Sequence, residues 1–333
     1  MNENDLLKNA LAQNVVLLAM DAEKEGKELA QQFSVRGYPT FMTLNSDGET
    51  LDRWLGYGGP EPFIEVMTAS LADPTTIDEK FARYRKEPTE ADAQKLADIR
   101  SYEGHHAEAV ALYKRAMALN PKTDVNYDAR IFESMVEGAR DELYSVDELK
   151  AQADRVINAD NGSPMDAVEV AMTMGRFAKK KGDMALYTPY LKAAVSATET
   201  TDDEMAIKYR RHLMPDFALH VEKNVDQAVQ YRKATLPEGW KEDANQLNGF
   251  AWWCFENEVN LDEGEKMARR GIELAQPGNE RANIYDTLAE ICNLKGDCAD
   301  AVEIMRLAVA DDPENEYFQK QLERFEKLLA EKS

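Results

Sequence analysis

The chain has 333 residues and a formal net charge of −22, from 62 acidic and 40 basic residues. This length accommodates two domains, or one domain followed by a repeat array, and the acidic surface disfavours nucleic acid and anionic membranes as partners. No apolar run approaches the roughly 20 residues that span a bilayer, and the start "MNENDLLKNA" lacks the basic and apolar regions of a secretory signal. As written, the sequence predicts a soluble, cytoplasmic protein.

The first seventy residues alternate between strand and helix patterns. Val15–Met20 ("VVLLAM") is a short unbroken apolar run, which is typical of a strand buried on both faces. "GKELAQQF" follows with apolar residues at helical spacing. A Ser-Asp-Gly turn at residues 46–48 separates "TFMTLN" from "ETLDRWL" and predicts a hairpin. Pro60 and Pro62 then open a helix, so the predicted order is strand, helix, strand, hairpin turn, strand, helix.

This order, together with "VRGYPTF" at residues 35–41, resembles the second half of a thioredoxin-like domain over about residues 10–72. In that family the proline of this segment, here Pro39, follows a cis peptide bond and faces the active-site cysteines. The resemblance implies a cis-proline segment made of Arg36, Gly37, Tyr38, Pro39 and Thr40. A cis X-Pro bond is uncommon, so a family keeps it for a geometric reason. The alternative is a trans Pro39 that only separates a helix from a strand.

The reactive cysteine pair of that family has no counterpart, because no cysteine precedes Cys254. In the family, the strand that leads to the Cys-x-x-Cys helix lies between the strands matching Val15–Met20 and Thr40–Asn45, and it would precede residue 1. Either Val15–Met20 pairs directly with Thr40–Asn45 in a thin three-stranded sheet, or the chain is incomplete. Thiol–disulfide exchange requires a thiolate and a resolving thiol, so we expect none from this part of the chain.

From Asp78 onward, strand signals are almost absent and glycines recur between helical runs. Residues 285–313 resemble the 34-residue tetratricopeptide repeat, which is a helix–turn–helix unit. Small residues are needed where its two helices cross closely. The template positions are filled by Tyr285, Leu288, Ala289, Cys292, Gly296, Ala301, Met305, Ala308 and Pro313.

The same template predicts three further units. Residues 94–121 fit it well, with Leu96, Ala97, Gly104, Ala109, Tyr113, Ala116 and Pro121 at the corresponding positions. Residues 170–195 fit more weakly, through Gly175, Gly182, Leu191 and Ala194. Residues 250–277 resemble a unit because Ala268 precedes Ala301 by 33 residues.

Residues 125–160 and 203–236 are predicted to form helix pairs that fit the template poorly, and residues 316–329 to form an amphipathic capping helix. The predicted fold class is therefore a two-part α+β and all-α protein. Its parts are a partial thioredoxin-like βαββα domain over residues 1–74 and an α-helical tetratricopeptide-like solenoid over residues 75–333.

Stacked helix pairs expose an extended concave surface that usually binds peptides or partner proteins. We therefore expect a protein or peptide partner on this face, and neither nucleic acid nor membrane. Some tetratricopeptide proteins grip a C-terminal carboxylate with Lys, Asn and Arg on their first helices. The corresponding faces here offer Lys95, Asp98, Arg176 and Lys179, which do not reproduce that set, so carboxylate capture is not predicted.

The cysteines allow two interpretations. Cys292 and Cys298 lie on either side of a predicted helix–helix turn and could form a redox pair. Both occupy positions that usually pack inward, and free cysteine is a typical small core residue. Cys254, within "FAWWCFE", is interpreted as part of an aromatic core. None of the three has the cationic neighbours that lower a thiol pKa.

No cofactor or metal site is predicted. His105 and His106 are adjacent in a turn, and His212 and His220 are eight residues apart, so neither pair has the spacing of metal ligands. The sequence also lacks a Gly-rich phosphate loop, a Gly-x-Ser-x-Gly motif and a His-Glu-x-x-His motif.

Two functions from different classes are consistent with these patterns. The favoured one is a non-catalytic protein-interaction scaffold. The alternative is a fragment of a thiol–disulfide oxidoreductase whose cysteine-bearing strand and helix are missing from this sequence. In that case Met1 is an internal methionine or a misplaced start, a signal peptide could be missing with the preceding residues, and the intact parent could be a periplasmic enzyme. Proteins with a thioredoxin-like domain before helical repeats are common in bacteria.

Overall fold

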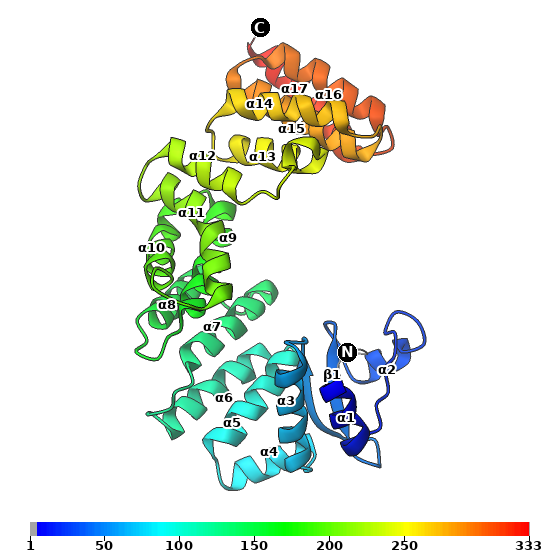
Figure 1. Ribbon diagram of the computed structural model, residues 1–333, viewed down its shortest axis with the longest axis vertical. Coiled ribbons are helices and arrows are strands. Elements are labelled where there is room, and N and C mark those ends of the chain that lie inside the picture. Colours follow the sequence, from blue (N-terminus) through cyan, green and yellow to red (C-terminus); the bar gives the residue numbers. More distant parts are fainter. Residues whose placement is uncertain (1–4, 333) are drawn as a thin grey trace. The chain divides into compact units, whose positions relative to one another are not determined.

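The computed structural model describes residues 5–332, which are mostly helical (Figure 1). The chain divides into two compact units: unit 1 ends at Phe177 and unit 2 begins at Ala178. Among the described residues there is one sheet, and it has two strands. From residue 78 to residue 332 no strand occurs, which confirms the all-helical character predicted for this part of the chain.

Unit 1 begins with a β-hairpin flanked by helices. Its elements are α1 (Asp5–Asn14), α2 (Lys27–Gln32), β1 (Thr40–Leu44), β2 (Thr50–Leu55) and α3 (Pro60–Ala72). The strands pair antiparallel, from Thr40 opposite Leu55 to Leu44 opposite Thr50. In the turn, the side chain of Asn45 accepts hydrogen bonds from the backbone of Asp47 and Glu49, and Gly48 has φ +80°. The predicted hairpin and the helices on either side of it are confirmed.

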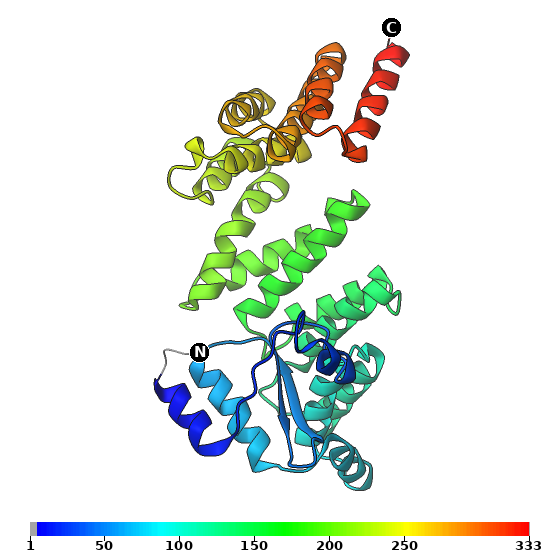
Figure 2. The ribbon, with the colours of Figure 1, turned by 90° about the vertical axis from the view of Figure 1, so that its right-hand side faces the viewer.

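One face of the hairpin packs against α1 and α3, which lie side by side in dark and light blue in Figure 2. Phe41 and Trp54 stack with their ring centroids 5.6 Å apart, and Phe63 of α3 meets Phe41 edge to face at 4.8 Å. Leu7 and Met67 complete this cluster. The aromatic side chains that alternate along the two strands therefore form the small core of the hairpin region.

The strand predicted at Val15–Met20 does not form. These residues are neither helix nor strand, and the side chains of Val16 and Leu18 are 99% and 73% exposed. Only Val15 packs against the cluster formed by α1, α3 and the hairpin. An apolar run becomes a buried strand only if it pairs with a neighbouring strand that satisfies its backbone, and Val15–Met20 pairs with no strand among the described residues. The predicted three-stranded sheet is wrong, and a thioredoxin-like domain is not shown.

A buried lysine joins the hairpin to the helices that follow it. Lys80, on α4 (Ile77–Lys86), is 3% exposed. Its ammonium donates to the backbone carbonyls of Leu51, Asp73 and Thr75 at 3.1, 3.1 and 2.5 Å. Burial lowers the pKa of this lysine. A charged group is tolerated here because its three donors are all satisfied by backbone oxygens.

The remaining helices of unit 1 begin where the sequence supplies caps. Thr76 before α4 and Ser145 before α8 each form a capping box with a glutamate three residues later. The helices that follow α4 are α5 (Glu90–Tyr102), α6 (His106–Leu119), α7 (Tyr127–Gly138), α8 (Val146–Ile157) and α9 (Pro164–Lys181). The last turn of α9 lies in unit 2. A 3-10 turn, η1 (Ala139–Asp141), follows α7. Contacts between α5 and α6 and between α7 and α8 define two antiparallel pairs.

Unit 2 continues with helix pairs and ends in a single helix. Its α-helices are α10 (Thr188–Ala197), α11 (Glu204–His220), α12 (Val225–Ala234), α13 (Ala244–Glu256), α14 (Leu261–Leu274), α15 (Asn279–Lys295), α16 (Cys298–Asp311) and α17 (Glu316–Lys332). Two 3-10 turns, η2 (Met184–Leu186) and η3 (Trp240–Glu242), precede α10 and α13. The helix pairs predicted at residues 203–236 and 250–277 and the terminal helix at residues 316–329 are confirmed.

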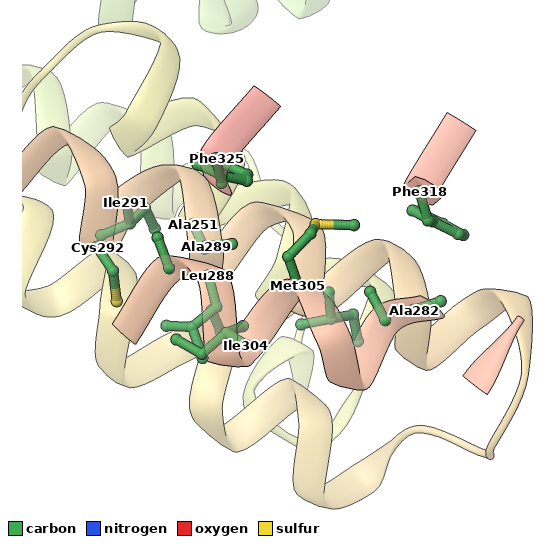
Figure 3. Packing of buried hydrophobic residues seen from close by; sticks show 14 of the residues in the cluster. Ala251, Ala282, Leu288, Ala289, Ile291, Cys292, Ile304, Met305, Phe318 and Phe325 are labelled. Carbon is green, nitrogen blue, oxygen red and sulfur yellow. The ribbon is translucent and has the colours of Figure 1, made fainter. Parts of the chain in front are cut away.

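The pair α15–α16 has the packing that the repeat template requires. Ala289, Ala301 and Ala308 are completely buried where the two helices cross, and Gly296 ends α15 with φ +97°. Phe318 and Phe325 of α17 cover the end of this core (Figure 3). Gly104 takes the same role between α5 and α6, with φ +81°. Left-handed backbone conformations of this kind favour glycine.

No helix in the described part of the chain is long and apolar enough to cross a lipid bilayer.

Candidate functional site

The predicted cis-proline segment forms the loop before β1. The Tyr38–Pro39 peptide bond is cis, as expected. Tyr38 is 63% exposed, and the hydroxyl of Thr40 donates to the carbonyl of Gly37 at 2.7 Å. The guanidinium of Arg36 lies against the turn between α5 and α6. Residues 1–177 contain no cysteine, so unit 1 provides this loop with no thiol.

The cysteines are buried in unit 2. Cys292 is a free thiol, so no disulfide joins it to Cys298. The thiol of Cys298 is 6% exposed and donates to Asn293 Oδ1 at 3.5 Å. Burial raises the pKa of Cys292 to about 11 and that of Cys254 to about 12. These surroundings favour core packing over redox chemistry, because the thiolate is the reactive form.

The histidines lie apart from any cluster of metal-ligating groups. His106 is 8% exposed at the start of α6, and burial lowers its pKa. Burial likewise lowers the pKa of His220 at the end of α11. Across residues 5–332, no group of three or more His, Cys, Asp or Glu side chains is arranged to hold a metal ion.

In unit 1, hydrogen bonds place the first helices of successive pairs side by side. The hydroxyl of Tyr127, on α7, donates to Glu90 Oε1 of α5 at 2.9 Å. Ser101 of α5 and Ser134 of α7 share a hydrogen bond of 3.2 Å. Asn126, which caps α7, donates to Asp166 of α9 at 2.9 Å. Side chains on the open side of α5, α7 and α9 therefore belong to one surface, which we call the first-helix face.

A row of charged side chains runs along the first-helix face. Asp98 on α5, Arg130 and Glu133 on α7, and Glu169 on α9 interact electrostatically with one another. The Arg130 guanidinium and the Glu133 carboxylate are 3.8 Å apart, and their side chains are 52% and 67% exposed. We call these four residues the charged row.

The carboxyl groups of the charged row are crowded by protein and still reach solvent. Burial raises the pKa of Glu133, with Arg130 opposing the shift. Burial also raises the pKa of Glu169, and the charge of Glu133 adds to this. Since the Glu133 side chain is 67% exposed, the surrounding helices flank the row without covering it. Charges in such recessed positions interact more strongly with a partner than charges on a convex surface.

The positions weighed for carboxylate capture have other partners. Lys95 on α5 forms an ion pair of 2.7 Å with Asp52 of β2, which is 1% exposed. Asp98 accepts a hydrogen bond of 2.6 Å from the Tyr113 hydroxyl, and burial raises its pKa. Arg176 donates to Thr173 at 3.1 Å. Lys95 fastens β2 to the helices, and is thereby drawn away from a ligand's carboxylate.

Of the four residues in the charged row, sequence reasoning identified Asp98 and missed the other three. Arg130 and Glu133 lie in a segment that fits the repeat template poorly, so their place on a first helix was not recognised. A usable signal was present, since Ile131 and Ser134 are buried one residue after each of them. Successive residues of a helix are rotated by roughly 100°, so this spacing turns Arg130 and Glu133 away from the buried side of α7, and both are exposed.

A pocket of about 210 Å³ lies between the second helices α6 and α8 and the end of α7. It is lined by Lys114, Met135, Tyr144, Glu148, Ala151, Gln152 and Arg155, from α6, the α7–α8 region and α8. This volume is below the roughly 300–1,000 Å³ usual for small-molecule sites, and its lining mixes both charge signs. It therefore gives no indication of a particular ligand.

No family model and no curated protein sequence matches this chain. Among solved structures, this chain is similar to YrrB, which is described as a tetratricopeptide repeat (TPR) protein with an unusual peptide-binding site. The two share 15% identity at a TM-score of 0.37, and the match covers 74% of this chain and 98% of that one. A tetratricopeptide repeat protein from Parabacteroides merdae matches at 12% identity and a TM-score of 0.39, covering 79% of this chain and 95% of that one. Yeast Tom70 matches at 16% identity and a TM-score of 0.37, covering 82% of this chain and 54% of that one.

TM-scores this low do not establish a shared overall fold, so the class of the protein rests on its own contacts. Antiparallel helix pairs with glycine turns and alanine-rich crossings make this chain an irregular array of tetratricopeptide-like helix pairs that follows a β-hairpin.

Proposed function

We propose that this chain is a non-catalytic scaffold that binds a peptide or partner protein on the concave, first-helix face of unit 1. The observation that carries the proposal is the charged row, in which Arg130, Glu133 and Glu169 are exposed while the helices around them are tightly packed. Arrays of helix pairs bind their partners along such faces. Three carboxyl groups around one guanidinium favour a partner segment that is mainly cationic.

The thioredoxin-like origin of residues 10–72 is proposed on narrower grounds. It rests on the "VRGYPTF" sequence and on the hairpin followed by α3, which have the order found in that family. The oxidoreductase alternative gains no support from unit 1, because residues 1–177 contain no cysteine. Coding DNA upstream of Met1 tests that alternative directly, since an in-frame Cys-x-x-Cys there would replace the scaffold function with an enzymatic one.

The scaffold function is tested by capturing partners with the full chain and with a charge-reversed variant. The variant is Glu133→Lys with Glu169→Lys, which inverts the sign of the charged row. The matched control reverses two exposed carboxylates on second helices, Glu108→Lys and Glu303→Lys, whose side chains are 61% and 71% exposed. Both variants carry the same net charge, so general electrostatic effects cancel.

A partner recovered with the native chain is then measured against all three proteins by titration calorimetry. We expect the control to bind like the native chain and the charge-reversed variant to bind about tenfold more weakly or worse. Equal affinity for the native chain and the charge-reversed variant would place the binding surface elsewhere and refute the proposed site. Circular dichroism of each variant verifies that the helices remain intact.

A further inference from the structure

The outer edge of β1 has unpaired backbone groups. The Gly56 N–H donates to the Pro39 carbonyl at 2.9 Å, which fixes the phase of the hydrogen bonds between the strands. In an antiparallel pair, alternate residues bond to the partner strand and the others point away. The register therefore turns the N–H and C=O groups of Thr40, Met42 and Leu44 away from β2. No third strand meets this edge among residues 5–332.

The same unit carries an exposed apolar segment that could supply a strand. Val16, Leu17, Leu18 and Met20 are 99%, 54%, 73% and 40% exposed. The run Val15–Met20 contains no charge, no proline and no glycine, which is the composition of segments that pair edge to edge. It is held at one end by Val15 in the hairpin cluster and at the other by contact of Met20 with Gly26.

Charge also favours these two segments as a meeting point for two copies of the chain. At a net charge of −22, most faces of two copies repel each other. Residues 9–20 and 37–46 contain no Asp, Glu, Lys or Arg. An interface built from the exposed run and the β1 edge brings no like charges together, and it removes apolar surface from water.

We propose that Val15–Met20 of one copy pairs with the outer edge of β1 in a second copy, and that the second copy returns the same contact. The two contacts are identical by symmetry, so the assembly closes as a twofold dimer. A second copy fits better than an unrelated strand because one chain carries both halves of the contact. Within a single chain the two halves are not paired. This inference is independent of the charged row.

The first test is sedimentation of the full chain over a range of concentrations. We expect a monomer–dimer equilibrium in which Leu18→Lys weakens the dimer by about tenfold or more, because it places two ammonium groups in an apolar contact. Leu307→Lys, at a leucine on α16 that is 49% exposed, is the matched control and should associate like the native chain. A native chain that stays monomeric at every concentration contradicts the proposal, as does a dimer that Leu18→Lys leaves unchanged.

The second test locates the contact and does not depend on the fold tolerating a buried charge. Chains carrying Leu18→Cys are mixed with chains carrying Met42→Cys under mild oxidation, and the disulfide-linked product is identified by peptide mapping. We expect a bond between residue 18 of one chain and residue 42 of the other, and none when Leu307→Cys replaces Met42→Cys. A doubly substituted chain that links only within itself would show that the run folds onto its own sheet, which overturns the dimer.

Discussion

Asp286, on α15, shows how one buried carboxyl group sets a pH response in unit 2. The side chain is 5% exposed; its Oδ2 accepts a hydrogen bond of 3.1 Å from the Tyr317 hydroxyl, and its Oδ1 has no partner. Burial raises the pKa of this carboxyl from 3.8 to about 6, and the nearby Glu290 adds to the shift. Arg324 of α17, which pairs with Glu290, opposes it. The ionised form is therefore unfavourable in the folded chain.

We predict that Asp286→Asn stabilises unit 2 at neutral pH. The folded pKa lies above the unfolded one, so the carboxyl stabilises the fold below pH 3.8, and this contribution is lost as the pH rises through 6. Removing the ionisation should add roughly 3 kcal/mol to the free energy of unfolding at pH 7.5, and about half of that at pH 5. Urea unfolding followed by tryptophan fluorescence measures this, because Trp240, Trp252 and Trp253 lie in unit 2.

Asp300→Asn, at an exposed position of α16, is the control for removing a negative charge from unit 2. It should change the free energy of unfolding by a few tenths of a kcal/mol at most. A stabilisation by Asp286→Asn that does not vary between pH 5 and pH 7.5 would mean that the amide acts through a new hydrogen bond and not through the lost ionisation.

The cysteines lead to a second prediction at the scale of single residues. Because burial raises the pKa of Cys254 to about 12 and that of Cys292 to about 11, almost none of either thiol is ionised at pH 8. In the native protein these two thiols should react with a thiol reagent at least about a hundredfold more slowly than a free thiol, and both should react readily once the chain is unfolded in urea. The chain should also fail to reduce insulin. Insulin reduction by the native chain that is lost when all three cysteines are changed to serine would contradict the expected absence of thiol chemistry.

At the scale of elements, Gly104 tests how the hairpin region and the first helix pair fit together. Its φ is +81°, and a Cβ there would lie 1.8 Å from Nη1 of Arg36. Gly48 has nearly the same φ, +80°, with open space around it. Gly104→Ala and Gly48→Ala should therefore share a backbone cost of about 1–2 kcal/mol, and Gly104→Ala should cost more because it displaces the Arg36 side chain.

Urea unfolding followed by circular dichroism compares the two glycine variants. Introducing Arg36→Ala should abolish the extra cost at Gly104 and leave the cost at Gly48 unchanged, as in a double-mutant cycle. If the excess survives without the Arg36 side chain, the turn is constrained by its own backbone and not by the loop before β1.

The helix pairs were predictable because their determinants are local. Spacing of 3.6 residues identifies the buried side of each helix, and glycines at positions such as Gly104 and Gly296 mark the turns. The alanines at 289, 301 and 308 indicate close crossing of two helices, and all three are completely buried. Each of these features depends on residues within one or two helical turns, so the sequence alone displays it.

The strand at Val15–Met20 was mispredicted because a strand is not a local property. Its apolar composition indicates that burial would be favourable. A buried strand must also pair its backbone with a neighbouring strand. Composition cannot show whether that neighbour exists. The charged row was missed for a related reason. Arg130 and Glu133 have the composition of an ordinary solvated helix face, and only the packing of α5, α7 and α9 places them in a row with Glu169.

At the scale of the whole molecule, the net charge of −22 predicts opposite salt responses for the two proposed contacts. The screening length falls from about 30 Å at 0.01 M salt to about 3 Å at 1 M. Binding of a cationic partner at the charged row should weaken steadily as salt is added. Self-association through uncharged segments should strengthen, because screening reduces the repulsion between copies. Titration calorimetry measures partner binding and sedimentation measures self-association, each at 0.05 and 0.5 M sodium chloride. If salt changed both affinities in the same direction, the two contacts would not differ in charge as proposed.

The Lys80 ammonium donates its hydrogen bonds to main-chain oxygens, at Leu51, Asp73 and Thr75, and also lies 3.7 Å from the Asp73 carboxylate. Main-chain carbonyls are present whatever the side chain, so these three hydrogen bonds place no demand on the identity of the residues that accept them. At these three points the helices hold the backbone of the preceding segment, whereas the ion pair between Lys95 and Asp52 depends on a side chain. In evolution or in engineering, the side chains of Leu51 and Thr75 can therefore change without removing the hydrogen bonds of Lys80. Because these hydrogen bonds use main-chain oxygens, Lys80 can make them to preceding segments of different composition.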